Sequence, residues 1–295
     1  MKIADLFNKK KVVYSFEIFP PKLNSSIEII YNTLSQLENL KPDYLSVTYG
    51  AGGSSVQNRT CEIASIIKNK YDIEPLSHLT CINSKKEEVK KILDTLKQNN
   101  VSNILAMRGD KSPNTIASEN FQYSYQLMDF IKQNSSYNLA GACYPEGHPE
   151  CESLEKDIEY MKLKEESGAE FFITQLFFEN SVFYEFLEQV RKIGIKAPIQ
   201  VGIMPVTSTK QIERIVYLSG AKIPHKLSKL LARYGNNKEA MTQAGIMYAT
   251  EQIVDLLENN VDGIHLYSMN NLNIARKITE NIDSIISAEN TSYIG

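Results

Sequence analysis

The stretch VVYSFEIFP, residues 12–20, is an apolar, β-branched and aromatic run that carries one carboxylate, Glu17, near its end. Seven further runs of this kind follow: YLSVTYG (44–50), PLSHLTC (75–81), NILAMRGD (103–110), LAGACYPEGHPE (139–150), EFFITQLFF (170–178), PIQVGIMPV (198–206) and GIHLYSMN (263–270). Segments with helical periodicity separate them. This alternation predicts a (β/α)8 TIM barrel, an α/β fold in which every parallel strand delivers its last side chains to one rim.

The segments between the runs have the apolar spacing of helices that pack on a sheet. Residues 85–100, KKEEVKKILDTLKQNN, place Val89, Ile92, Leu93 and Leu96 on one helical face. We expect Ser84 to cap this helix, with Glu87 three residues later. Further helices are expected at 25–40, 57–70, 121–133, 152–167, 181–193 and 209–219, with an additional helix and a break at 233–237 before the eighth run, and a last helix at 272–287.

Length and charge are typical of one enzyme domain rather than of a nucleic-acid-binding or membrane protein. The chain has 295 residues, and its 32 Lys and Arg against 35 Asp and Glu give a net charge of −3. No long single-sign block indicates a nucleic-acid partner. The first residues lack the apolar core of a secretory signal, and no apolar stretch approaches the ~20 residues that cross a bilayer. We therefore expect a single cytoplasmic domain spanning residues 1–295.

The four cysteines, Cys61, Cys81, Cys143 and Cys151, are expected to be free thiols in a reducing compartment. The pairs His78/Cys81 and His148/Cys151 share an H-x-x-C spacing, and thiolate with imidazole is a common zinc ligand set. Residues three apart on a strand point to opposite faces, which disfavours a shared ion at His78 and Cys81. We expect no metal, and zinc stays as an alternative.

Several polar residues stand where a strand would end. Glu17 alternates with Tyr14, Phe16 and Ile18, so it faces either into the barrel or away from it. A carboxyl buried in an aromatic barrel mouth has a raised pKa, which suits a proton donor, although a salt-bridged structural glutamate is also consistent with the pattern. Gln175 follows a buried run, and we expect its amide to bond a ligand or a neighbouring strand end, because an unpaired amide costs about 1–3 kcal/mol.

A second group of polar residues lies near the fourth and fifth runs. Arg108, Gly109 and Asp110 place a cation, a flexible backbone position and an anion in three consecutive residues. A surface turn with an ion pair would have the same sequence. His148 lies in a Pro-Glu-Gly-His-Pro loop, and Asp157, Tyr160 and Lys164 follow on one helical face. That face is either solvated or suited to the phosphates and hydroxyls of a nucleotide.

No glycine pattern of the Rossmann or P-loop type follows any of the runs. A dinucleotide cofactor would therefore be held in another way. The glycine-rich stretch 50–55, GAGGSS, follows the second run, and its backbone can approach a flat or anionic ligand closely. A tight turn between strand and helix would need the same glycines.

Eight strings, in this order and spacing, resemble the bacterial single-domain type of methylenetetrahydrofolate reductase. They are SFEIFPPK (15–22), SVTYGAGGSS (46–55), HLTC (78–81), ILAMRGD (104–110), ACYPEGHPE (142–150), GAEFFITQLFF (168–178), VGIMPV (201–206) and IHLYSMN (264–270). The resemblance covers nearly the whole chain. It implies a flavoprotein of one-carbon metabolism that carries FAD, takes a hydride from NAD(P)H and reduces 5,10-methylenetetrahydrofolate to 5-methyltetrahydrofolate. It also leads us to expect a homo-oligomer.

The same resemblance implies roles for individual residues. Glu17 matches the family's general acid, Asp110 matches the carboxylate near the flavin and the pterin, and Gln175 matches the amide that contacts the substrate. The residues that match the FAD site are Thr48, His78, Arg108, Gly109, Asp110, Tyr123, Ser124, Ala142, Tyr144, His148, Asp157, Tyr160 and Lys164. Two expected substrate positions depart from the pattern: Ile215 replaces an aromatic ring, and Asn271 replaces an arginine. These departures affect substrate contacts and not the class of reaction.

Two other hypotheses are consistent with the sequence. A barrel methyltransferase would use zinc through His78, Cys81, His148 and Cys151. A protein that binds flavin or folate without catalysis is the other. Bound flavin that bleaches and recovers distinguishes the reductase from both.

Overall fold

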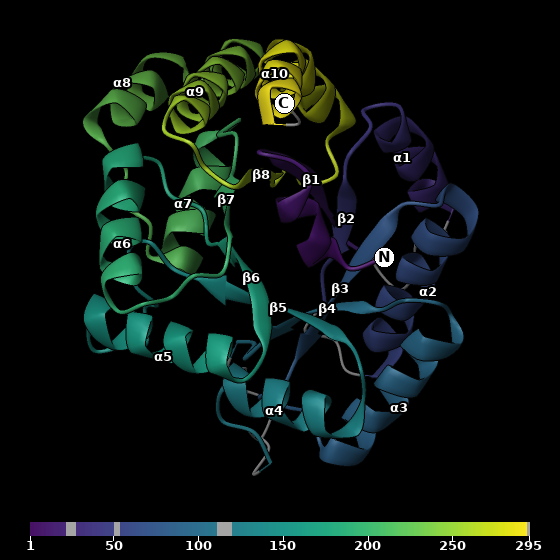
Figure 1. Cartoon of the computed structure of the whole chain (residues 1–295). Helices are drawn as coiled ribbons and strands as arrows, with labels where there is room; N and C mark the ends of the chain where they lie inside the picture. The colour runs from purple at the N-terminus through teal and green to yellow at the C-terminus, as the bar shows by residue number, and fades with distance from the viewer. Residues whose placement is uncertain (22–27, 50–53, 111–119, 294–295) are drawn as a thin grey trace.

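The computed structural model describes residues 1–21, 28–49, 54–110 and 120–293 of the chain. Eight parallel strands close into a barrel in sequence order, β1 pairing with β8 (Figure 1). The strands are β1 Val13–Ile18, β2 Tyr44–Val47, β3 Glu74–Thr80, β4 Asn103–Met107, β5 Asn138–Cys143, β6 Ala169–Thr174, β7 Ile199–Ile203 and β8 Gly263–Leu266. The predicted TIM barrel is confirmed, with one strand in each of the eight apolar runs.

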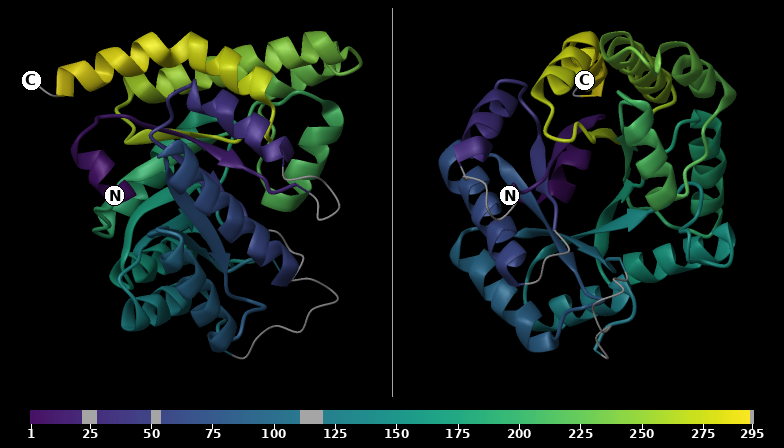
Figure 2. Two further views of the ribbon diagram at one scale, coloured as in Figure 1. Left: turned by 90° about the vertical axis from the view of Figure 1, so that its right-hand side faces the viewer. Right: turned by 180° about the vertical axis from the view of Figure 1, so that it is seen from behind.

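Helices surround this barrel on its outside, as the end-on and side views show (Figures 1 and 2). They are α1 Glu28–Glu38, α2 Ser54–Tyr71, α3 Lys86–Gln98, α4 Ser124–Asn134, α5 Leu154–Glu166, α6 Asn180–Lys192, α7 Thr209–Ser219, α8 His225–Tyr234, α9 Lys238–Glu258 and α10 Leu272–Tyr293. The apolar stripes of most of these helices pack on the outward side chains of the strands in one large core, whereas α7 and α8 pack in a separate cluster. In α3 the buried residues are Val89, Ile92, Leu93 and Leu96, as the periodicity predicted.

The cap predicted for α3 was wrong. The helix begins one residue later than expected, with Lys85 at the N-cap, and the Glu88 carboxylate accepts a hydrogen bond from the Lys85 N–H at 2.8 Å. Ser84 is buried, and its hydroxyl donates to the Thr80 carbonyl at 2.9 Å. Its side chain therefore bonds the end of β3, and the capping contact of α3 is made by Lys85 and Glu88 instead.

The connection between β7 and β8 contains α8 and α9 in addition to α7, in the long interval where extra helices and a break were expected. The break between α8 and α9 falls at 235–237, within the predicted range, and Asn237 caps α9 by accepting from the Ala240 N–H at 3.0 Å. A separate hydrophobic cluster, which includes Leu176, Met204 and Ile212, joins these helices to the ends of β6 and β7. The last helix, α10, runs six residues past the predicted end at 287.

Parallel pairing decides which side chains face the barrel interior. Glu17 on β1 pairs with Ser46 on β2, and Ser46 pairs with Leu76 on β3. Paired residues point to the same face of the sheet, and residues two apart on one strand do so as well. Tyr44 donates a hydrogen bond to Gln200 on β7, which is not a neighbouring strand, so this face is the interior. Glu17 therefore points inward, as does His78, two residues after Leu76.

The N-terminal end of the barrel is closed by a short 3-10 helix, η1 Ile3–Asn8 (Figure 2). Its buried residues Ile3, Leu6 and Phe7 pack against inward side chains of the strands, including Tyr44 and Phe171. Apolar packing fills this end of the interior, so polar ligands must approach from the opposite end. Within the described part of the chain, every helix is too short or too polar to span a bilayer.

Candidate functional site

A cavity of about 730 Å³ opens at the C-terminal ends of β3 to β6. This volume is within the range of about 300–1,000 Å³ that small-molecule and cofactor sites occupy. The predicted site residues that line it are Arg108, Gly109, Asp110, Tyr123, Ser124, Ala142, Tyr144, His148, Asp157, Tyr160, Lys164 and Gln175. The fold therefore brings most of the predicted cofactor residues together around one space.

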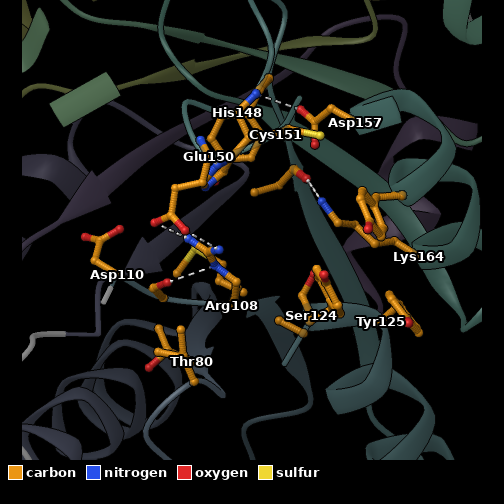
Figure 3. A pocket seen from close by; sticks show the side chains of 18 of the residues that line it. Thr80, Arg108, Asp110, Ser124, Tyr125, His148, Glu150, Cys151, Asp157 and Lys164 are labelled. Atoms are coloured by element: carbon orange, nitrogen blue, oxygen red, sulfur yellow. Dashed lines mark hydrogen bonds and ion pairs between the residues drawn. The ribbon is translucent and has the colours of Figure 1, made fainter. Parts of the chain in front are cut away.

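An ion pair joins Arg108, at the end of β4, to Glu150, in the loop after β5 (Figure 3). The two terminal guanidinium nitrogens donate to the two carboxylate oxygens at 3.1 and 3.0 Å, which is a bidentate arrangement. Arg108 Nε also donates to the Gly109 carbonyl at 3.3 Å. These bonds fix the guanidinium plane at the cavity wall, where an anionic group of a ligand can meet it.

The loop after β5 is tied to helix α5 through His148. The His148 N–H donates to Asp157 at 3.0 Å, and His148 Nδ1 accepts from the Glu150 N–H at 3.0 Å (Figure 3). Burial raises the pKa of Asp157, opposed by the Lys164 charge and by the His148 hydrogen bond. Burial also lowers the pKa of His148, so its imidazole is neutral near pH 7 and can accept this bond.

Lys164 is the buried cation of the cavity. Its side chain is 9% exposed, and Nζ donates to the carbonyl of Ala142 on β5 at 2.8 Å (Figure 3). Burial lowers the pKa of Lys164, with the Asp157 carboxylate opposing the shift. An ammonium group has three donors. Lys164 can therefore bond an anionic ligand while it keeps its contact with β5.

Three tyrosines form a column of parallel rings at the cavity rim. Tyr123 stacks on Tyr160 with centroids 5.0 Å apart and on Tyr125 at 5.7 Å, with interplanar angles of 18° and 13°. Lys156 Nζ lies 5.8 Å from the centre of the Tyr160 ring. Offset stacking of this kind extends readily to a further flat ring. The column offers a planar ligand an aromatic surface at the side of the cavity that α4 and α5 form.

Gly109 keeps the cavity wall close to β3. Its φ is +84°, and a Cβ at this position would lie 2.9 Å from Thr80 Cβ. A larger residue would be strained by both the conformation and the contact. Asp110 follows with an exposed carboxylate at the cavity (Figure 3). Arg108, Gly109 and Asp110 therefore all line the cavity, directly after the end of β4.

Glu17 and His78 lie inside the barrel and outside the residues that line the cavity. Glu17 Oε2 lies 3.8 Å from His78 Nε2, and the two residues are 8% and 5% exposed. Burial raises the pKa of Glu17 to about 8 and lowers the pKa of His78 to about 3. At neutral pH the pair is a protonated carboxylic acid beside a neutral imidazole.

Gln175 and Thr48 stand at strand ends, as predicted. Gln175 Oε1 accepts from the Leu176 N–H at 2.9 Å, and its backbone N–H donates to Cys143 on β5 at 2.7 Å. The amide oxygen therefore bonds the next residue and not a neighbouring strand end, so a contact between the amide and a ligand stays a prediction. Thr48 lies outside the cavity lining; its N–H donates to the Ile18 carbonyl at 3.0 Å.

Ile215 and Asn271 also lie outside the cavity lining. Ile215 is partly buried and packs against the cluster that holds α7 onto the ends of β6 and β7. Asn271 is exposed at the start of α10, where Oδ1 accepts from the Ile274 N–H at 3.3 Å. Neither side chain therefore belongs to the set of residues that line the cavity together with Lys164.

Several lining residues were missed, among them Thr80, Tyr125, Glu150, Cys151 and Lys156. Glu150 stands two residues after His148 in the quoted loop, and a charge partner for Arg108 was the signal to look for. Tyr125 repeats Tyr123 two residues later. The first four residues of the glycine-rich stretch 50–55 lie outside the described residues.

The zinc hypothesis has no ligand cluster in the described ranges. All four cysteines are free, and no group of three His, Cys, Asp or Glu side chains among the described residues converges as metal ligands would. Cys81 turns its Sγ to the Arg108 carbonyl at 3.7 Å and belongs to the outer core, whereas His78 faces inward. The H-x-x-C pair of β3 is thus divided between the two faces.

Residues 2–283 match the family model described as methylenetetrahydrofolate reductase. "Methylenetetrahydrofolate reductase (NADH) 1" of Arabidopsis thaliana is 33% identical over 284 residues, which are 91% of this chain and 48% of that protein. "5,10-methylenetetrahydrofolate reductase" of Salmonella typhimurium is 32% identical over 256 residues, which are 87% of this chain and 86% of that protein. The chain thus spans about half the length of the plant relative and most of the bacterial one.

The fold is shared with solved structures. One of them is an uncharacterized protein from Clostridium thermocellum described as binding two copies of 5-methyl-5,6,7,8-tetrahydrofolic acid. The TM-score is 0.67 with 16% sequence identity, and the match covers 98% of this chain and 100% of that one. This likeness concerns the barrel architecture.

Proposed function

Because the chain belongs to the methylenetetrahydrofolate reductase family, we propose that it reduces 5,10-methylenetetrahydrofolate to 5-methyltetrahydrofolate with electrons from NAD(P)H passed through bound FAD. The names of its relatives support the reaction, and those of plants specify NADH. The observation that carries the proposal is the cavity, in which Arg108, Lys164, the tyrosine column and the Gly109 backbone gather at the rim where TIM-barrel enzymes place their chemistry.

The residues of the cavity fit a flavin dinucleotide. Arg108 and Lys164 offer fixed positive charge to a pyrophosphate, and the Tyr123 column offers a stacking surface to a flat ring. Gly109 lets the backbone approach a ligand where a Cβ would fill the space beside Thr80. Thr48, His78, Ser124, Ala142, Tyr144, His148, Asp157 and Tyr160 complete the proposed FAD site. When bound, FAD supplies the hydride chemistry, and the protein supplies orientation and charge.

Glu17 is the proposed general acid. The reaction consumes a proton, because the amine nitrogen of the one-carbon bridge must be protonated as the bridge opens. Burial raises the pKa of Glu17 to about 8, so its carboxyl holds a proton at neutral pH. A carboxyl with an ordinary pKa would be ionised there and could not donate.

Asp110 and Gln175 are the proposed contacts to the pterin, because both line the cavity at the ends of β4 and β6. Ile215 and Asn271 remain proposed contacts to more distant parts of the substrate. They lie on the segments after β7 and β8, on the other side of the barrel mouth from the cavity. A folate that reaches from Gln175 toward these segments would cross the mouth above Glu17.

The experiment is an anaerobic titration of the purified protein with its flavin absorbance recorded. We expect the flavin band to bleach with NADH or NADPH and to return on addition of 5,10-methylenetetrahydrofolate, with 5-methyltetrahydrofolate as the product. Bound zinc without flavin would instead support the methyltransferase hypothesis. Flavin colour that does not respond to the folate would support a non-catalytic binding protein.

A further inference from the structure

His78 and Glu17 face each other in the barrel from strands that are not neighbours. Glu17 lies on β1 and His78 on β3, with β2 between them, and His78 Nε2 approaches Glu17 Oε2 to 3.8 Å. The parallel register makes both side chains inward-facing. Among the described residues, His78 Nε2 is buried and has no hydrogen-bond partner.

A buried ring nitrogen without a partner is costly, and such a group is unusual in a folded protein. The other inward-facing imidazole, His265 on β8, has both nitrogens engaged, with Ser15 Oγ at 2.6 Å and Ser46 Oγ at 3.3 Å. His78 thus differs from His265 in having a nitrogen available. Contacts between catalytic groups are often long in the absence of substrate and shorten in the complex, so 3.8 Å is within reach of a bond.

We propose that His78 is a positioning residue for Glu17, whose Nε2–H donates a hydrogen bond to the Glu17 carboxylate as that acid gives up its proton. This inference rests on the proposed function and adds a residue role to it. In the step, the Glu17 O–H bond breaks, an N–H bond forms on the amine nitrogen of the folate bridge, and the remaining carboxylate accepts from His78. The imidazole stays neutral, and no other proton moves.

The other titratable groups near Glu17 carry no positive charge that could stabilise its ionised form. Among the described residues, the titratable groups that interact with Glu17 are His78 from β3, Tyr44 from β2 and Tyr267 from β8, and His265 on β8 interacts with His78. Burial raises the pKa values of both tyrosines and lowers the pKa of His265 to about 3, so these three are neutral near pH 7. No cation among them stabilises an ionised Glu17. A neutral N–H donor is what the Glu17 site offers.

The test separates the two half-reactions in His78→Leu and His78→Gln. Leucine removes the donor, whereas the glutamine amide reaches the position of Nε2 and restores it. A hydrogen bond to a charged group is worth a factor of about ten to a hundred. We expect His78→Leu to slow flavin reoxidation by 5,10-methylenetetrahydrofolate by about that factor, and His78→Gln to stay within about threefold of the parent. Because His78 is also a proposed FAD contact, both half-reactions are measured on flavin-loaded protein, and in His78→Leu reoxidation by the folate should fall by a larger factor than bleaching by NADH.

The pH profile gives a second readout, because the same loss weakens the acid. In His78→Leu, the alkaline limb of reoxidation should move up by about one to two pH units. The carboxyl itself can be titrated without turnover by infrared or carbon-13 NMR spectroscopy, with Glu17→Gln used to assign its signal. The pKa of Glu17 should rise in His78→Leu and in His78→Asn, whose amide is too short to reach.

Tyr14→Phe is the matched control, because Tyr14 is also on β1 but bonds Thr279 on the outer face. It should leave the Glu17 titration unchanged. A Glu17 pKa that is the same in His78→Asn, His78→Leu and the parent would overturn the proposal. So would equal slowing of both half-reactions in His78→Leu and His78→Gln, which would make His78 a flavin contact only. If the parent itself does not turn over the folate, the proposed function fails, while the carboxyl titration still tests the pair.

Discussion

Asn270 holds both backbone polar groups of Phe19, and this pair joins the end of the last strand to the end of the first. Asn270 Oδ1 accepts from the Phe19 N–H at 3.0 Å, and Asn270 Nδ2 donates to the Phe19 carbonyl at 2.8 Å. Asn270 has a positive φ of 59°, a conformation that asparagine tolerates better than most residues. Phe19 follows Glu17 by two residues, so these two hydrogen bonds also hold the end of the strand that carries the proposed general acid.

Asn270→Ala should lower the free energy of unfolding more than Asn270→Gly does. Both variants lose the two hydrogen bonds to Phe19, at a cost of about 1–3 kcal/mol. Only alanine adds the strain of the positive φ, about 1 kcal/mol. Urea unfolding of the two variants and the parent measures both differences. Equal stability of all three proteins would show that the two hydrogen bonds between Asn270 and Phe19 contribute nothing to the free energy of unfolding.

Lys164→Ala should weaken FAD binding by roughly ten- to a hundredfold, since one charge-assisted contact is worth about 1.5–3 kcal/mol. Lys162→Ala is the control, because Lys162 lies on the same helix but bonds Glu165 and does not line the cavity. The rate of FAD loss, followed by recovery of flavin fluorescence, distinguishes the two. If both variants release FAD at the parent rate, Lys164 serves only its bond to Ala142.

Asp110→Asn should leave FAD bound but raise its reduction potential, because removing a nearby anion makes the added electrons less unfavourable. Reduction of the folate should fall more than oxidation of NADH. Glu152→Gln is a suitable control, since it neutralises another exposed carboxylate of the same cavity. The potential is measured against a reference dye. An unchanged value in Asp110→Asn would argue against a carboxylate beside the flavin ring.

Glu17→Gln should separate the half-reactions, because glutamine keeps the shape but cannot release a proton. General acid catalysis is worth about 10²–10⁴-fold. Rapid mixing should therefore show near-normal flavin bleaching by NADH and reoxidation by the folate slowed by at least about a hundredfold. Normal reoxidation would remove Glu17 from the mechanism, and equal slowing of both stages would make its role structural.

The raised pKa of Glu17 predicts that flavin reoxidation and stability of the parent protein depend on pH. Since burial raises the pKa of Glu17 from 4.5 to about 8, reoxidation should be constant below about pH 8 and fall above it. The folded state holds this proton more tightly than the unfolded chain. Its contribution to stability is therefore present at low pH and is lost as pH rises from about 4.5 through about 8. Glu17→Gln should abolish both trends, which activity profiles and unfolding at several pH values would reveal.

Local patterns were sufficient for the barrel and drew attention to some of the cavity residues, whereas the others were expected on the resemblance alone. Strands and helices differ in the period of their apolar residues, and this period can be read from residues close together in the sequence. Arg108, Asp110 and His148 were noticed because they stand at the ends of two runs, and Lys164 because it shares a helical face with Asp157 and Tyr160. The extra helices before β8 were expected from the length of that interval, and the break at 235–237 separates α8 from α9. The α3 cap failed because Ser84 bonds β3 instead.

Contacts between distant segments could not be inferred in this way. The Arg108–Glu150 pair and the stacking of Tyr123 on Tyr160 join different loops and helices, so no local spacing encodes them. Ile215 and Asn271 were expected near the substrate on the resemblance alone. Their distance from the cavity lining depends on where α7 and α10 pack against the barrel, a matter of tertiary contacts.

By itself the sequence determined the order of strands and helices, the barrel class and the residues at each strand end, because these follow from the period of apolar side chains along one chain. It left open whether Glu17 faces inward or outward, since a strand has two faces. The tertiary structure decided that point through the register with Ser46, and it placed His78 3.8 Å from the Glu17 carboxyl. The raised pKa of Glu17 arises from the burial that closure of the barrel imposes.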